Sequence, residues 1–111
     1  MLFASLLLAT AAPAETIGGT WTVDLSPAGD GSYTQPMTLE ANEDGTLGGT
    51  FYGTSIERGR WAENSGRTCI SFVTSDNSGA YLHAGCLTEG GMDGQSFATG
   101  RSTLFLWKAT R

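Results

Sequence analysis

Turn-forming clusters recur about every 8–12 residues along most of this chain, and they constrain its fold more than any other feature. Asn42–Gly45, Glu63–Gly66 and Asp76–Gly79 are polar clusters that end in glycine, which supplies the positive φ of a tight hairpin. The runs between the clusters alternate polar and apolar residues, as in Thr20–Leu25. After residue 14 no window has apolar residues at helical spacing, so we predict no helix. The pattern therefore predicts an all-β domain.

Eight runs between the turns have strand character. Their spacing suits a sandwich or a barrel, and the short connections favour an eight-stranded antiparallel up-and-down β-barrel over a Greek key. A barrel also leaves no unpaired strand edge. The glycine-rich stretch Glu89–Gly94 is expected to be a turn that precedes a strand, not a phosphate-binding loop before a helix. The expected strands are Thr20–Leu25, Tyr33–Ala41, Thr46–Gly53, Ser55–Ala62, Arg67–Ser75, Ala80–Leu87, Gln95–Thr99 and Ser102–Thr110.

The two cysteines, Cys69 and Cys86, lie on the fifth and sixth of these strands. If the hairpin is centred on Asn77 and Ser78, Cys69 lies directly opposite Cys86. Directly opposed residues of a non-hydrogen-bonded pair bring their Cβ atoms close enough for a disulfide. We therefore predict a Cys69–Cys86 bridge. Two thiols without CxxC spacing do not favour a metal or redox site.

Residues 1–14, MLFASLLLATAAPA, have the apolar run and the Ala12–Ala14 small-residue pattern of a secretory signal peptide, although no Lys or Arg precedes the run. The run is too short to span a bilayer, and no cysteine follows it that could carry a lipid anchor. The expected organisation is a signal peptide at 1–14 and a β-barrel domain at 15–111. The mature domain is expected to be periplasmic or secreted, without a stable membrane anchor.

The balance of charge excludes some partners. The chain has 6 Lys+Arg against 11 Asp+Glu, a formal net charge of −5, and no basic cluster. Nucleic-acid binding needs a basic surface, so we expect no nucleic-acid partner.

Catalytic patterns are weak in this sequence. His83 is the single histidine, which by itself makes neither a metal site nor a catalytic triad. No serine stands in a G-x-S-x-G context, and the carboxylates match neither a calcium loop nor a paired-carboxylate site. We expect no catalytic residues, no metal and no cofactor. If the chain were an enzyme, His83 would be the general base.

Aromatic residues concentrate in the expected strands. A small barrel either fills its interior with such side chains or holds one small ligand among them. The candidate ligand-binding set is Trp21, Phe72, Tyr81, His83 and Trp107. The alternative is that the same residues form an ordinary packed core.

Two ends of the sequence carry a resemblance. Gly19-Thr20-Trp21 resembles the G-x-W start of the calycin barrels, the lipocalins and avidins, and Trp107–Arg111 is similar to an avidin C-terminal strand. Asp44–Phe51 also resembles an avidin hairpin. The resemblance implies a barrel closed by a late basic residue over the early tryptophan, here Arg111 or Lys108 over Trp21. Positions that hold biotin in avidins carry Val23, Pro27 and Phe51 here, so the resemblance does not imply biotin binding.

Two functions of different class follow from these observations. The first is an exported, non-catalytic barrel that binds a small, partly apolar ligand. The second is a protein-binding module such as a periplasmic or secreted protease inhibitor, since some bacterial inhibitors are similar small barrels with one disulfide.

Overall fold

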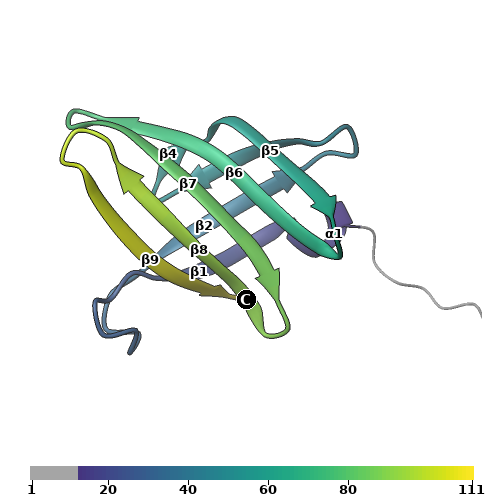
Figure 1. Ribbon diagram of the computed structural model, residues 1–111, viewed down its shortest axis with the longest axis horizontal. Coiled ribbons are helices and arrows are strands. Elements are labelled where there is room, and N and C mark those ends of the chain that lie inside the picture. The colour runs from purple at the N-terminus through teal and green to yellow at the C-terminus, as the bar shows by residue number, and fades with distance from the viewer. Residues whose placement is uncertain (1–12) are drawn as a thin grey trace, which may run out of the picture.

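Residues 13–111 form one closed, all-β barrel in the computed structural model, which describes these residues of the chain (Figure 1). Eight antiparallel strands follow one another around the wall in up-and-down order, and the two-residue β4 is an appendage of β3. The predicted fold class is therefore confirmed. The strands are β1 (Gly19–Asp24), β2 (Thr34–Ala41), β3 (Thr46–Phe51), β4 (Thr54–Ser55), β5 (Glu57–Asn64), β6 (Arg67–Asp76), β7 (Gly79–Thr88), β8 (Gly91–Ala98) and β9 (Thr103–Thr110).

The barrel closes where β1 pairs with β9. Thr22 lies opposite Thr110 and Val23 opposite Ala109, so the first and last strands are neighbours in the wall. At the other side of β1, β2 continues into β3, which pairs in turn with β5. The barrel strands thus have partners on both sides, which removes the edges that an open sheet would expose.

The hairpin of β6 and β7 has the predicted register. Asp76 lies opposite Gly79, Val73 opposite Leu82 and Cys69 opposite Cys86. The two cysteines form a disulfide across this pair, with their Cα atoms 4.0 Å apart. The predicted bridge is therefore confirmed, and it lies near the end of the barrel where β7 turns into β8.

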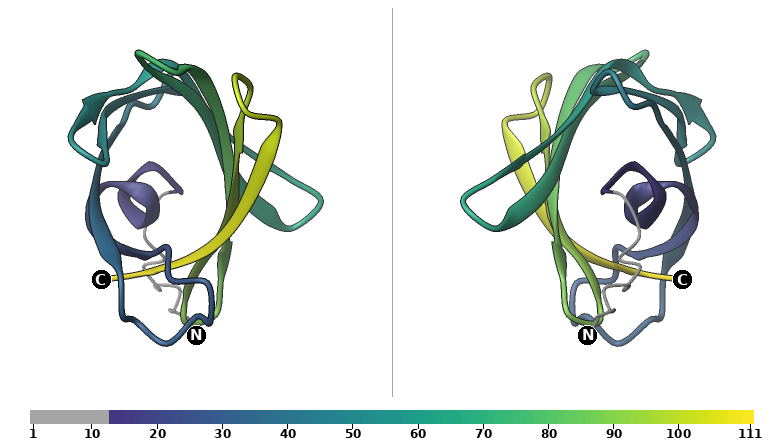
Figure 2. Two further views of the ribbon diagram at one scale, coloured as in Figure 1. Left: turned by 90° about the vertical axis from the view of Figure 1, so that its left-hand side faces the viewer. Right: turned by 90° about the vertical axis from the view of Figure 1, so that its right-hand side faces the viewer.

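One element contradicts the expectation of no helix. Pro13–Ile17 forms a single helical turn, α1, that lies inside the ring of strands (Figure 2). The side chain of Ile17 is fully buried, and its carbonyl oxygen accepts a hydrogen bond of 2.8 Å from the indole nitrogen of Trp21. A turn of five residues is too short to show helical periodicity, and here tertiary contacts hold it. The predicted cleavage site after Ala14 falls within α1, while residues 1–12 of the predicted signal peptide lie outside the described residues.

Strand β8 begins earlier than predicted, at Gly91 instead of Gln95. Of the glycines that suggested a turn, Gly90 lies in the turn, whereas Gly91 and Gly94 belong to the strand, where their neighbours leave no room for a Cβ atom. A Cβ on Gly94 would lie 2.2 Å from the indole of Trp107, and one on Gly91 would lie 2.2 Å from the carbonyl oxygen of Ala109. Here glycine permits close packing, not a change of chain direction.

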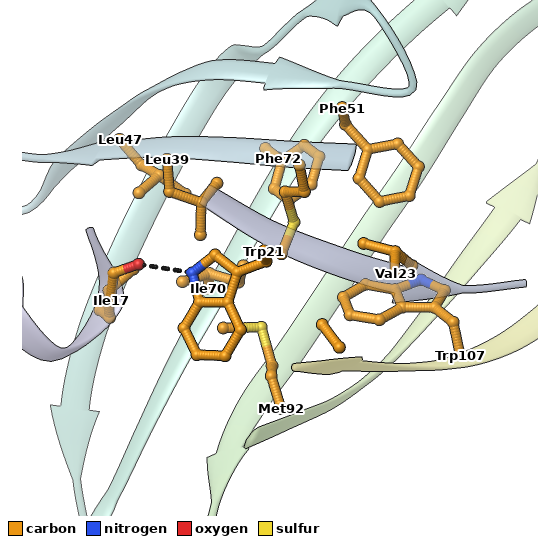
Figure 3. Close-up of a cluster of buried hydrophobic side chains, with 12 residues drawn as sticks. Ile17, Trp21, Val23, Leu39, Leu47, Phe51, Ile70, Phe72, Met92 and Trp107 are labelled. Atoms are coloured by element: carbon orange, nitrogen blue, oxygen red, sulfur yellow. Dashed lines mark hydrogen bonds between the residues drawn. The ribbon is translucent and has the colours of Figure 1, made fainter. Parts of the chain in front are cut away.

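The core is a cluster of buried side chains inside the barrel that includes Ile17 of α1 at one side and Phe51 and Trp107 at the other (Figure 3). Burying one large aliphatic or aromatic side chain contributes about 1.5–3 kcal/mol, so this cluster is the main source of stability. Its members are Ile17, Trp21, Val23, Met37, Leu39, Leu47, Phe51, Ile70, Phe72, Met92, Trp107 and Ala109.

No helix among residues 13–111 has the length and apolar character to cross a membrane.

Candidate functional site

A cavity of about 370 Å³ opens at the end of the barrel opposite α1. It lies among the turns that join β1 to β2, β3 to β4, β6 to β7 and β8 to β9. Its volume is within the usual range for small-molecule sites, roughly 300–1,000 Å³. The lining residues are Leu25, Tyr33, Phe51, Tyr52, Thr54, Thr74, Ser75, Asp76, Tyr81, His83, Ser96, Arg101 and Phe105.

A chain of hydrogen bonds forms the inner end of this cavity, which we call the floor: Thr74, His83 and Ser96. The hydroxyl of Thr74 lies 2.8 Å from Nε2 of His83, and Nδ1 of His83 lies 2.7 Å from the hydroxyl of Ser96. The indole nitrogen of Trp107 donates to the same Ser96 oxygen at 2.9 Å. All four side chains are at least 95% buried, so this series of hydrogen bonds connects the cavity to the core.

Strand register explains why these polar groups meet. His83 on β7 lies opposite Phe72 on β6 and Ser96 on β8, so the three residues form one inward-facing row around the wall. Thr74 is two residues beyond Phe72 and shares its face, because side chains alternate along a strand. The floor thus marks the level at which the apolar core gives way to the cavity.

Aromatic rings enclose the imidazole of His83. Its centroid lies 4.4 Å from that of Phe51 and 4.7 Å from that of Phe72, with which it is stacked. Burial among these rings disfavours the charged imidazolium and lowers the pKa of His83 to about 4. His83 is therefore neutral at pH 7, with one ring nitrogen as a donor and the other as an acceptor.

The mouth of the cavity carries the charged groups. The hydroxyl of Tyr81 donates to Asp76 at 2.9 Å and accepts from the guanidinium of Arg101 at 3.3 Å. The Arg101 guanidinium carbon lies 5.8 Å from the ring centroids of both Tyr81 and Phe105. Across the mouth, Tyr33 and Tyr52 are half-exposed neighbours with centroids 6.2 Å apart. Aromatic faces and a few polar tips thus surround the opening.

The structure divides the predicted ligand-binding set. Tyr81 and His83 line the cavity, whereas Trp21, Phe72 and Trp107 are buried in the core. Of these three, Trp107 reaches the floor through its bond to Ser96, and Phe72 touches it through the His83 ring. The binding role of the set stays a prediction.

The predicted closing pair lies at the opposite end of the barrel. The guanidinium of Arg111 lies over the indole of Trp21 and donates hydrogen bonds to the backbone oxygens of Thr16 and Gly18. Lys108 instead forms an exposed ion pair of 2.9 Å with Asp93. This end is therefore covered by α1 and Arg111.

Sequence reasoning missed Thr74, Ser96 and Arg101. The predicted strand Arg67–Ser75 already placed Thr74 on the same face as Phe72. A polar residue on the inward face of a barrel strand could therefore have marked Thr74 as a candidate site residue. Ser96 was within the predicted strand Gln95–Thr99, but only the full length of β8, which places buried Met92 on the same face, shows that Ser96 points inward. Arg101 lies in the turn after β8, and up-and-down order brings that turn to the same end as the turn at Asn77.

No three His, Cys, Asp or Glu residues within 13–111 come close enough together to hold a metal ion.

Fold and cavity together define a class: a small, closed, eight-stranded up-and-down barrel with one end covered and the other open on a cavity of small-molecule size. Comparisons of the chain with protein-family models, curated proteins and solved structures found no match.

Proposed function

We propose that this protein is an exported, non-catalytic barrel that binds a small, partly apolar ligand in the open-end cavity. The observation that carries the proposal is the cavity itself, which combines a volume of about 370 Å³ with aromatic walls and a few convergent polar groups. Phe51, Tyr81 and Phe105 offer ring faces for an apolar body. The hydroxyls of Thr74 and Ser96 offer polar contacts at the inner end.

The state of His83 supports binding over catalysis. An effective general base has a pKa near the working pH, and His83 has a pKa of about 4. Both of its ring nitrogens are also engaged, with Thr74 and with Ser96. The ring is therefore suited to holding two hydroxyls in place.

A calycin-like relationship and export are parts of the same proposal. The closed up-and-down barrel and the packing of Arg111 on Trp21 support the first. The Cys69–Cys86 disulfide supports a periplasmic or secreted location, because disulfides persist in oxidising compartments. Mass spectrometry of the exported protein would test the second part, with a mature chain beginning at Glu15 as the expected result.

The binding proposal is tested by screening a metabolite and lipid library against the tryptophan fluorescence of the protein. A compound that binds in the cavity should bind at least about tenfold more weakly to Phe105→Ala, which removes a lining ring. Leu104→Ala is the matched control, because Leu104 is the neighbouring residue, is exposed and does not line the cavity. Equal weakening by both variants, or a library without any ligand, would contradict the proposal.

One surface favours the second candidate, a protein-binding module. Leu82, Phe97 and Leu104 lie directly opposite one another across β7, β8 and β9, and each is at least 37% exposed. Leu106, which is 71% exposed, points from the same side of β9. Exposed apolar patches of this kind mark partner surfaces.

Inhibition of a panel of secreted proteases would test this second candidate. If it holds, the wild type inhibits one of them stoichiometrically, Leu106→Glu abolishes the inhibition, and Phe105→Ala retains it. Absence of inhibition across the panel removes the protease-inhibitor function.

A further inference from the structure

The floor of the cavity, together with the Trp107 indole that donates to it, has one more polar hydrogen than the hydrogen bonds among these groups use. The four groups are the indole N–H of Trp107, the hydroxyls of Ser96 and Thr74, and the single N–H of neutral His83. They supply four hydrogens, but only three hydrogen bonds join them. No other hydrogen bond is formed by these side chains among the described residues.

The tautomer of His83 decides which group holds the spare hydrogen, but not whether there is one. With the hydrogen on Nε2, the ring donates to Thr74 and Ser96 donates to Nδ1, so the Thr74 hydroxyl is free to donate. With the hydrogen on Nδ1, the ring donates to Ser96 and Thr74 donates to Nε2, so the Ser96 hydroxyl is free. Trp107 can only donate, so it cannot absorb the excess.

Thr74 and Ser96 both line the cavity, and both residues are about 95% buried. Solvent in the cavity can accept the spare hydrogen, but a ligand that fills the inner end displaces that solvent. A ligand without an acceptor would then leave a buried donor unpaired, which costs about 1–3 kcal/mol.

We propose that the cavity selects ligands whose inner end carries a neutral hydrogen-bond acceptor, such as a ketone, ester or ether oxygen, on an apolar body. This inference rests on the proposed function and adds the chemistry of the ligand. The acceptor is neutral because the floor offers a single hydroxyl hydrogen and no charged group, whereas a desolvated carboxylate would need several donors or a cation. The cation of the site, Arg101, lies at the mouth, beside Tyr81.

Two compounds of nearly the same shape test the inference on the wild-type protein: 4-propylacetophenone, which has an acceptor, and 1-ethyl-4-propylbenzene, which has none. Once each affinity from calorimetry is corrected for the compound's own transfer free energy from water to a hydrocarbon solvent, the ketone should bind at least about tenfold more tightly, the equivalent of one buried donor being satisfied. The carbonyl stretch of the bound ketone should lie at lower frequency than in a hydrocarbon solvent. Because the chain has a single histidine, the ring signals of His83 should identify the floor without ambiguity, and the ketone should move them more than the hydrocarbon does.

A third compound, 4-propylbenzoate, tests whether the acceptor must be neutral. A carboxylate at the floor would draw a proton onto His83 at pH 7, and we expect the ring signals to show no such protonation.

Equal corrected affinities for the ketone and the hydrocarbon, a carbonyl stretch at its hydrocarbon-solvent frequency, or protonation of His83 by the benzoate would each overturn the inference. Failure of the ketone to bind at millimolar concentration would overturn it as well. The library screen with Phe105→Ala and Leu104→Ala decides the proposed function separately, so a ligand found there can stand even if the floor shows no preference.

Discussion

The guanidinium carbon of Arg111 lies 4.1 Å from the ring centroid of Trp21, joining the residue that follows β9 to β1 at the covered end of the barrel. The contact is more than cation–π packing, because the same guanidinium donates to the carbonyl oxygens of Thr16 and Gly18. Arg111 therefore holds α1, β1 and the end of β9 together.

Replacing Arg111 with alanine should lower the free energy of unfolding by about 1–2 kcal/mol, since both the cation–π contact and the hydrogen bonds to Thr16 and Gly18 are lost. Urea unfolding followed by circular dichroism measures the change. Lys108→Ala is the control, because its ion pair with Asp93 is exposed and such pairs contribute about 0–1 kcal/mol. Equal effects of the two substitutions would show that Arg111 has no special closing role.

Gly94→Ala should destabilise the barrel by about 1–3 kcal/mol. The added methyl group would lie 2.2 Å from the indole of Trp107, and overpacking of a full core forces strained rotamers or a shift of the strand. Gly90→Ala is the matched control, because a Cβ at Gly90 meets nothing within 4 Å. The difference between the two thermal midpoints measures the effect, and similar midpoints would refute the packing account of Gly94.

Removing the disulfide by Cys69→Ala and Cys86→Ala together should cost about 3 kcal/mol, the chain-entropy estimate for a loop with a sequence separation of 17. The double variant and the wild type are compared by urea unfolding under oxidising conditions. Reductant should lower the stability of the wild type and leave the variant unchanged. Two reactive thiols in the unreduced, denatured wild type would contradict the bridge itself.

The ring signals of His83 should titrate in the folded protein with a midpoint near pH 4, well below the ordinary value of 6.5, because burial disfavours the imidazolium. The unfolded chain binds this proton first as the pH falls. The contribution of neutral His83 to stability is therefore complete above about pH 6.5 and is lost progressively as the pH falls toward 4.

The carboxylate of Asp24 affects stability at lower pH than His83 does. Hydrogen bonds from Ser26, the largest from its hydroxyl, lower the pKa of Asp24 below 3.8, so its contribution is lost only in stronger acid. Proton NMR across pH 2–8, with urea midpoints measured in parallel, checks both statements. A His83 midpoint near 6.5 would show that the ring is open to solvent.

Turn residues and the alternation of side chains along each strand were enough to predict the order and pairing of the strands that form the barrel. The Asp76–Gly79 turn has a short, polar hairpin sequence, and once it is centred, the period of two along each strand places Cys69 opposite Cys86. Because the connections are short, strands that follow one another in the sequence must pair with one another. A Greek key needs one long return connection, and the sequence offers none, so the meander is predicted. These inferences succeed because turn residues and strand alternation act over a few residues.

The floor of the cavity and the covered end depend on residues far apart in the chain. Gly91 and Gly94 look like turn residues in the sequence, but both lie in β8 between β7 and β9, where Ala109 and Trp107 leave no room for a Cβ atom. Ile17 has no helical pattern around it, and it is held in a helical turn by its bond to Trp21 and its burial in the barrel. Closure of the wall brings such partners together, so these features depend on packing in three dimensions and leave little trace in local sequence.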